Sequence, residues 1–201
     1  MKKVILLSLL VSCFVIAFSQ VGTNIFVGYG LGLKTTATPD ATSIFTSGYT
    51  DGMKISLIDV GFLVDYEIAD GFSIGAGVGG AIPMGASGLQ IVNLDTAGAS
   101  STTLKYFFDG LMGVSYSYPL QPVVLRADLL GGISFFDFTR LKDFGFLVKA
   151  KFGLGYQMGG FTINVGAGYE LRNYNVNFGD GEKGSFSIQS VPIELGITLR
   201  F

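Results

Sequence analysis

The residues of this sequence that could take part in catalysis or ion binding are charged side chains in segments where polar and apolar residues alternate. They stand in short segments in which apolar residues occupy the positions between them. Carboxylates held close together could serve as general acid and base, and a mixed set of charges could line a narrow polar channel. The candidates are Asp59, Asp65, Glu67, Asp109, Arg126, Asp128, Lys149, Lys151, Glu170, Arg172, Glu194 and Arg200.

Other kinds of chemistry are disfavoured by the residue types present. The chain has no histidine, which excludes histidine-based catalysis and histidine-ligated metal sites. Gly75, Gly77 and Gly80 match the spacing of a dinucleotide-binding turn, but they lie inside a predicted strand with no helix after it. A pI near 5.0 and a net charge of −2 argue against nucleic acid as a partner. We therefore expect no catalytic residue, cofactor or metal site.

The overall composition lies between those of soluble and helical membrane proteins. Of 201 residues, 49% are hydrophobic and 14% are charged, with a mean hydropathy of +0.52. Soluble domains carry about 25% charged residues. The uncharged stretches 71–94 and 152–169 are broken by glycines and polar residues, so they do not read as spanning helices.

The N-terminus has the pattern of a secretory signal peptide. Lys2 and Lys3 precede an apolar segment over 4–17, and a small-residue cleavage site follows, between Ser19 and Gln20. We therefore predict two parts, a signal peptide over 1–19 and one domain over 20–201.

Cys13 leaves an alternative open at this end of the chain. Leu10-Val11-Ser12-Cys13 is similar to a bacterial lipobox, in which Cys13 would be lipidated and become the mature N-terminus. The apolar stretch before Cys13 is short, however, and continues beyond it. An ordinary signal peptide is the favoured prediction, and it leaves the mature chain without cysteine.

Apolar and polar residues alternate along almost all of the remaining chain, which predicts β-strands with one apolar face. The last segment is unbroken, with Val191, Ile193, Leu195, Ile197 and Leu199 on one face and polar, small or proline residues between them. Phe26 is an exception, an apolar residue on the polar face of its segment. The eight predicted strands lie within 24–33, 59–68, 72–82, 108–118, 123–134, 146–156, 161–172 and 191–201.

Short and long connections also alternate between these strands. The connections at 69–71, 119–122 and 158–160 are tight and contain glycine or proline. Those at about 34–53, 83–103, 136–143 and 173–185 are long, and we expect them to be loops. An even number of strands with this alternation places both termini at the short-turn end, as in outer-membrane barrels.

Alternation alone does not say which face points outward. A soluble ligand-binding barrel has its apolar face inside, whereas a membrane barrel has it outside. The signal peptide and a glycine-rich polar face that carries both signs of charge favour the membrane barrel, whose eight strands leave room inside for little except side chains. Aromatic residues near the short turns favour it too. They are Tyr66, Phe72, Tyr116, Tyr118, Tyr156, Phe161 and Phe201.

The final strand, residues 191–201, resembles the terminal strand of bacterial outer-membrane β-barrels, and residues 20–201 resemble the OmpA/OmpX-like barrel domain. The resemblance implies an eight-stranded antiparallel transmembrane barrel in the outer membrane, with periplasmic termini. It implies that the C-terminal aromatic, Phe201, is the signal for the barrel assembly machinery, and that lipid is a second partner. Enzymes among outer-membrane barrels generally use histidine, which this chain lacks.

Because charges inside a narrow barrel are costly unless paired, we expect the candidate charges to form a salt-bridge network that fills the lumen. The predicted function is then structural, or an interaction through the loops with an unknown ligand, without catalysis. A small porin-like channel for ions or small solutes is the first alternative. A soluble periplasmic lipocalin-like barrel is the second.

Overall fold

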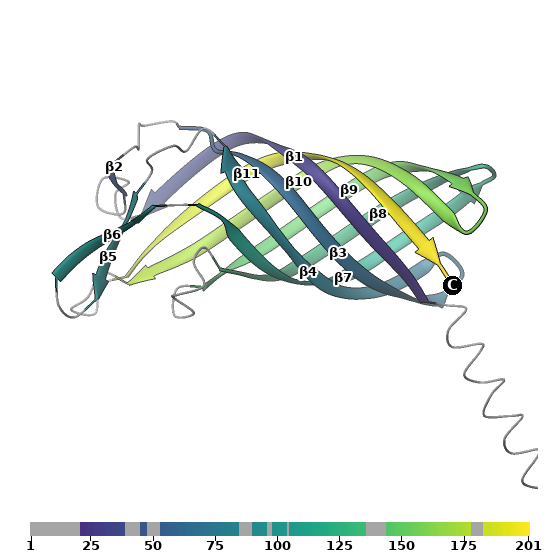
Figure 1. The fold of residues 1–201 in the computed structure, drawn as a ribbon, viewed down its shortest axis with the longest axis horizontal. Coiled ribbons are helices and arrows are strands. Elements are labelled where there is room, and N and C mark those ends of the chain that lie inside the picture. Colours follow the sequence, from purple (N-terminus) through teal and green to yellow (C-terminus); the bar gives the residue numbers. More distant parts are fainter. Residues whose placement is uncertain are drawn as a thin grey trace, which may run out of the picture.

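Eight long strands close into one antiparallel barrel in the computed structural model of this chain (Figure 1). Around the barrel the order is β1-β11-β10-β9-β8-β7-β4-β3, so every barrel strand pairs with its neighbours in the chain and the first pairs with the last. This confirms the predicted all-β, eight-stranded fold. The barrel strands are β1 (Val21–Thr38), β3 (Ser56–Ala69), β4 (Phe72–Met84), β7 (Phe107–Leu120), β8 (Val123–Phe135), β9 (Phe144–Met158), β10 (Phe161–Asn177) and β11 (Lys183–Arg200).

Part of the chain lies outside this description. The structure describes residues 21–38, 45–47, 53–84, 90–95, 98–103, 105–135, 144–177 and 183–201. The predicted signal peptide over 1–19, its cleavage site between Ser19 and Gln20, and Cys13 all lie outside the described residues. Among the residues described, no helix is long and apolar enough to cross a membrane.

The tight connections gather at one end of the barrel, which we call the turn end; the opposite end is the loop end. Gly71 and Gly159 take positive φ angles of 71° and 62° in their hairpins, a conformation that glycine adopts without a steric penalty. The backbone N–H of Phe201 donates to the carbonyl oxygen of Val21 at 3.1 Å. The C-terminus and the start of β1 therefore meet at the turn end, as Figure 1 shows.

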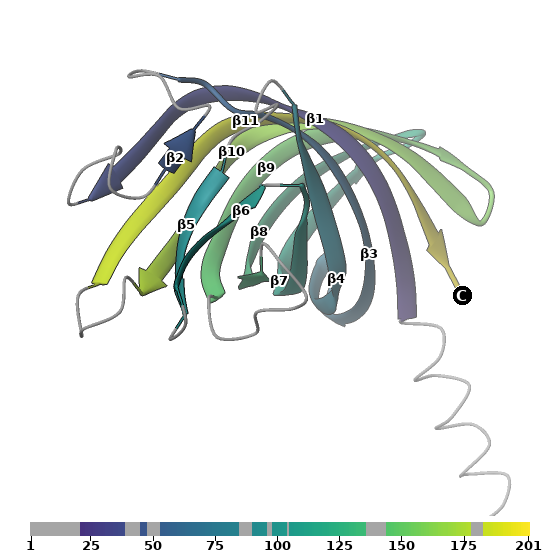
Figure 2. The same ribbon diagram turned by 60° about the vertical axis from the view of Figure 1, so that its left-hand side comes forward.

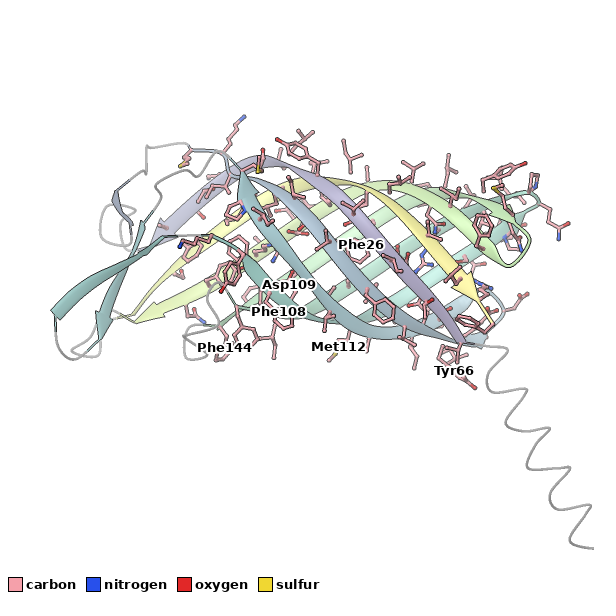
Figure 3. The ribbon with its side chains drawn as sticks, in the orientation of Figure 1. Phe26, Tyr66, Phe108, Asp109, Met112 and Phe144 are labelled. Atoms are coloured by element: carbon pink, nitrogen blue, oxygen red, sulfur yellow. The ribbon has the colours of Figure 1, made fainter. Side chains whose placement is uncertain are left out.

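The apolar face of the strands points outward. Ile25, Leu129, Phe152 and Leu195 are among the large apolar side chains that are at least half exposed, and such side chains occur on every barrel strand. Figure 3 shows Phe108, Met112 and Phe144 projecting away from the barrel, with Tyr66 at the turn end. Every backbone group of a closed sheet has a partner, so this barrel can present its apolar exterior to lipid. A soluble barrel needs the reverse placement of faces, which contradicts the lipocalin-like alternative.

Two of the expected long loops, 34–53 and 173–185, begin or end as continuations of barrel strands. β1 and β11 continue to pair as far as Thr38 and Ser185, and the β10–β11 hairpin continues to Asn177 and Lys183. Backbone hydrogen bonds hold these extensions, and they need no alternating apolar residues. The strand prediction was wrong there because alternation reports the environment of side chains and not the pairing of backbones.

A second, small sheet was also missed. β2 (Phe45–Ser47), β5 (Gln90–Asp95) and β6 (Gly98–Thr103) form a three-stranded sheet in segments that were expected to be loops. Figures 1 and 2 show it at the loop end. The expected loop over 136–143 lies outside the described residues.

Candidate functional site

The candidate site is the lumen of the barrel, where the structure places all twelve charged residues singled out in the sequence. Every one of them forms at least one ion pair. Ten belong to one continuous network, and the other two, Glu67 and Arg200, pair at the turn-end mouth. The ten are Asp59, Asp65, Asp109, Arg126, Asp128, Lys149, Lys151, Glu170, Arg172 and Glu194.

Arg172 on β10 is the centre of the network toward the loop end. Its Nε lies 2.6 Å from Oε1 of Glu170, and its two terminal nitrogens lie 2.7 Å from Oδ1 of Asp109 and 3.2 Å from Oδ1 of Asp59. The Arg172 side chain is 1% exposed. A buried guanidinium is tolerated only with this density of partners, and strands β3, β7 and β10 each supply one of them.

Two lysines on β9 connect this centre to the rest of the lumen. Lys149 Nζ lies 2.6 Å from Oε2 of Glu170 and 2.9 Å from Oε1 of Glu194. Lys151 Nζ lies 2.6 Å from the other oxygen of Glu194 and 3.6 Å from Asp128. The Glu194 carboxylate therefore bridges two lysines spaced two residues apart on one strand, which only side chains on the same face can achieve.

Arg126 on β8 is the second centre, toward the turn end. It donates to Oδ1 of Asp128 at 2.7 Å, to Oδ2 of Asp65 at 3.2 Å, and to the hydroxyls of Ser115 at 3.1 Å and Thr198 at 3.4 Å. Both nitrogens that carry two N–H groups are therefore engaged, and Nε is engaged as well. A guanidinium with its donors satisfied in this way is suited to holding strands together and poorly suited to capturing a mobile anion.

Apolar side chains share the lumen with the charges and, apart from the exception at Phe26, were not predicted there. Phe26, the exception in the alternation of β1, points inward and packs with Leu63, Leu111, Leu130 and Leu147. Figure 3 shows Phe26 and Asp109 inside the wall. The sequence contains a signal for their inward position. Each of these leucines is two residues from a charged residue or a glycine, and therefore on the polar face of its strand.

Phe26 is also a neighbour of the lysines. Its ring centroid lies 5.5 Å from Nζ of Lys149 and 4.8 Å from Nζ of Lys151, within the range of a cation–π contact. A Cβ added to Gly61 on β3 would overlap the same ring. The ring therefore occupies the space that a side chain at position 61 would take, beside the charged network.

An aromatic stack closes the lumen on the loop side of Arg172. The ring of Tyr174 stacks on Phe107 with centroids 5.2 Å apart and on Phe186 with centroids 4.8 Å apart. Its hydroxyl lies 2.7 Å from Oγ of Ser134, and the guanidinium of Arg172 lies 5.2 Å from the Phe107 ring. Ile55, Leu57 and Ile188, all fully or almost fully buried, complete this apolar layer.

The cavities that these side chains line are small. A cavity of about 30 Å³ lies between Phe26, Lys151 and Asp128, and one of about 110 Å³ lies at the turn-end mouth below Arg126. The first has room for one or two waters and the second for several.

Glycines keep the wall close to the network: a Cβ at Gly28 would overlap Glu194, and one at Gly75 would overlap Asp65.

Of the remaining sequence candidates, the glycines of the G-x-G-x-x-G pattern lie within β4, in the barrel wall. No group of acidic or cysteine residues arranged to hold a metal ion occurs among the described residues. The side chain of Phe201 is 65% exposed at the turn end, so a role for it in assembly stays a prediction.

No protein-family model matches this sequence, and no curated protein matches it. Solved structures do. The crystal structure of neisserial surface protein A, NspA, aligns with a TM-score of 0.52 at 10% identity, over 90% of this chain and 97% of that one. The outer membrane protein AlkL in lipid bilayers (TM-score 0.48, 13% identity, 90% and 89%) and OprG from Pseudomonas aeruginosa (0.44, 12%, 90% and 95%) are also similar.

An identity of 10% shows a shared fold and no more. In this chain the fold has eight strands, closure of the first on the last, and an apolar exterior around a charged interior. By its fold, this chain is a closed, eight-stranded antiparallel β-barrel, similar in architecture to neisserial surface protein A.

Proposed function

We propose that this protein is an integral outer-membrane barrel with a closed lumen, which acts as a structural element or binds a partner at its loop end, without catalysis. The continuous ion-pair network carries the proposal. Six carboxylates and four cationic side chains from β3, β7, β8, β9, β10 and β11 pair with one another inside the barrel, and the aromatic stack around Tyr174 lies on their loop side. These groups hold the wall and leave space for only a few waters.

The location and orientation belong to the same proposal. The apolar exterior supports insertion in a membrane, and the structures that this chain resembles are outer membrane proteins. With the turn end and both ends of the mature chain in the periplasm, the longer connections and the small sheet β2-β5-β6 stand outside the cell. Surface loops are where barrels of this kind differ and bind.

Membrane fractionation combined with surface proteolysis of whole cells tests this part of the proposal. We expect the folded barrel in the outer-membrane fraction, with cleavage confined to the loop-end connections. Recovery in the soluble periplasm without detergent would contradict the membrane location, and cleavage at the turn end alone would contradict the orientation.

A small channel is the second candidate, favoured by the two small cavities that Arg126 lines. Planar-bilayer recording separates the two. We expect no reproducible single-channel steps from the wild-type protein. Discrete steps that vanish when Arg126 or Arg172 is replaced would show that the network gates a pore and would overturn the closed lumen.

A further inference from the structure

The outer wall of the barrel is hollowed where β11, β1, β3 and β4 lie side by side. This groove has a volume of about 890 Å³, within the range of small-molecule sites. Its lining is almost wholly apolar and includes Ile25, Val27, Val60, Phe62 and Leu195. A barrel exterior is convex, so a depression of this size needs a local cause.

The cause is a lack of side-chain volume on the outer faces of β4 and β7. Gly80 occupies an outward position there and pairs with Phe108, while Val78 pairs with Gly110 on β7. No atom lies within 4 Å of where a Cβ of Gly110 would stand.

Three lysines stand above this groove at the loop end of the same wall. Lys34 is two residues beyond Gly32, which lies against Ile55, and Lys54 directly precedes Ile55. Lys105 is two residues before Phe107, which pairs with Ala81 on β4. All three side chains are exposed. They are the only cationic side chains outside the lumen in the part of the chain whose side chains the structure describes.

These lysines are not neutralised by their described surroundings. None of them forms an ion pair or hydrogen bond with another described side chain. The only acidic side chain outside the lumen among those described is Asp70, in a hairpin at the turn end. The rim above the groove is therefore positively charged and uncompensated within the described part of the chain.

The distance from the rim to the groove matches a lipid. Three residues separate Lys105 from Phe108 and six separate Lys54 from Val60, which is about 10 to 20 Å along the strands. Strands of such barrels tilt by roughly 40°, which shortens the height to about 8 to 15 Å. The hydrocarbon half-thickness of a bilayer is about 15 Å. A headgroup at the lysines would thus place its acyl chains in the groove.

We propose that this wall is a specific binding site for an anionic membrane lipid: a phosphate-bearing headgroup on Lys34, Lys54 and Lys105, and at least two acyl chains in the groove. Charge complementarity selects the headgroup, and the apolar volume selects the chains. The site rests on the proposed membrane location but not on the closed lumen or on any loop partner. Each lysine near an anionic headgroup contributes about a fivefold gain in affinity.

Native mass spectrometry of the detergent-refolded full barrel tests the site. The probes are dimyristoyl phosphatidylglycerol and dimyristoyl phosphatidylcholine, which have the same chains and different headgroup charge. We expect the wild type to retain phosphatidylglycerol about tenfold better or more. The triple variant Lys34→Gln, Lys54→Gln, Lys105→Gln should lose this preference to within twofold. Millimolar inorganic phosphate should not displace the lipid, because the chains hold it.

A matched pair of wall variants tests the groove. Val60→Trp fills it, whereas Val148→Trp places the same ring on the outer face of β9; the two valines are 53% and 43% exposed. We expect Val60→Trp to lower retention of both lipids and Val148→Trp to leave retention unchanged. A heat-modifiability gel on every sample verifies folding, and Val60→Phe replaces the larger variant if it does not fold.

Any one of the following results would overturn the site: equal retention of the two lipids by the wild type, an unchanged preference in the triple lysine variant, or equal effects of the two tryptophans. Displacement by free phosphate would show an anion site without lipid selectivity and would likewise overturn it. A wild type that folds and inserts but shows no lipid preference leaves the proposed function standing. A wild type that fails to enter bilayers contradicts that function itself.

Discussion

At the scale of single residues, the lumen combines groups that are costly to bury with partners that offset the cost. Arg172 shows this most clearly, since its three carboxylate partners come from three strands and its side chain is almost fully buried. Removing one member of such a network leaves the others buried and unpaired, which costs more than the pair itself contributes. Exposed pairs behave differently because water solvates both partners.

Replacing Arg172 by alanine should therefore destabilise the barrel by about 3–5 kcal/mol, because Asp109, Glu170 and Asp59 lose their shared cation. Urea unfolding in lipid vesicles, followed by tyrosine fluorescence and gel mobility, measures this. Arg200→Ala is the matched control. Its partner Glu67 lies at the mouth, the two side chains are 50% and 27% exposed, and the loss should stay below about 1 kcal/mol. Equal losses would contradict the assignment of Arg172 as a centre of the network.

Phe26 provides the second prediction at this scale. Phe26→Ala removes an inward ring that packs against four leucines and two lysines, and it leaves a cavity in the lumen. The expected loss is about 3–5 kcal/mol. Its neighbour Ile25 is 54% exposed on the outer wall, where lipid replaces the lost atoms, so Ile25→Ala should cost clearly less. The same unfolding experiment compares the two, and a larger loss for Ile25→Ala would show that the inward position of Phe26 is wrong.

At the scale of elements, the hairpins of the turn end depend on particular glycines, and three of them differ in instructive ways. Gly71 has a φ of 71°, and a Cβ there would overlap the backbone oxygen of Ser117. Gly159 has a φ of 62° but open space around it. Gly160 has neither constraint. Alanine at a positive φ costs about 1–2 kcal/mol, and a clash adds to that cost.

Alanine substitutions at these three positions should accordingly rank Gly71→Ala as the most destabilising, then Gly159→Ala, with Gly160→Ala within about 0.5 kcal/mol of the wild type. Refolding yield into vesicles and the urea midpoint both measure the order. If Gly160→Ala were as harmful as Gly71→Ala, the assigned hairpin conformations would be incorrect.

At the scale of the whole molecule, closure of β1 on β11 converts eight strands into a structure without a free edge, which a lipid environment requires. The closing seam is long, since β1 and β11 stay paired from Gly22 and Arg200 to Thr38 and Ser185. Phe201 stands just beyond this seam with an exposed side chain. It contributes little to packing in the folded barrel, so a role in assembly would act before folding is complete.

Deletion of Phe201 should reduce the amount of heat-modifiable barrel in cells several-fold while leaving refolding of the purified chain in detergent nearly unchanged. Semi-native electrophoresis of outer-membrane fractions and of refolded protein measures both. Normal cellular levels of the folded form after deletion would contradict the assembly signal. An equal loss in the refolded protein would instead assign Phe201 a structural role.

Much of this architecture follows from the sequence because side chains along a strand alternate between its two faces. A shift of one residue would move every side chain to the opposite face. The pattern over 191–201 and its seven counterparts was sufficient to predict the strand number and to sort the side chains of each strand onto an apolar and a polar face. It placed Asp59, Arg126, Arg172 and their companions together on the polar face, and the mixed charges, the glycines of that face and the aromatic residues near the short turns favoured the lumen for it. These are local properties, since a side chain's face depends only on its position along its own strand.

Only the tertiary structure decided which of those charges meet. Arg172 and Asp109 are 63 residues apart in the chain, and their contact depends on the stagger of strands around the closed barrel. The same holds for the inward leucines and for the aromatic stack. In the sequence they are single apolar residues on a polar face, and they contact one another only in the closed barrel. The outer groove below Lys34, Lys54 and Lys105 arises in the same way, because it needs four strands side by side. Alternation determines which face of the barrel wall a side chain lies on. Closure and register determine which side chains it contacts, and those contacts determine the free-energy cost of burying a charge.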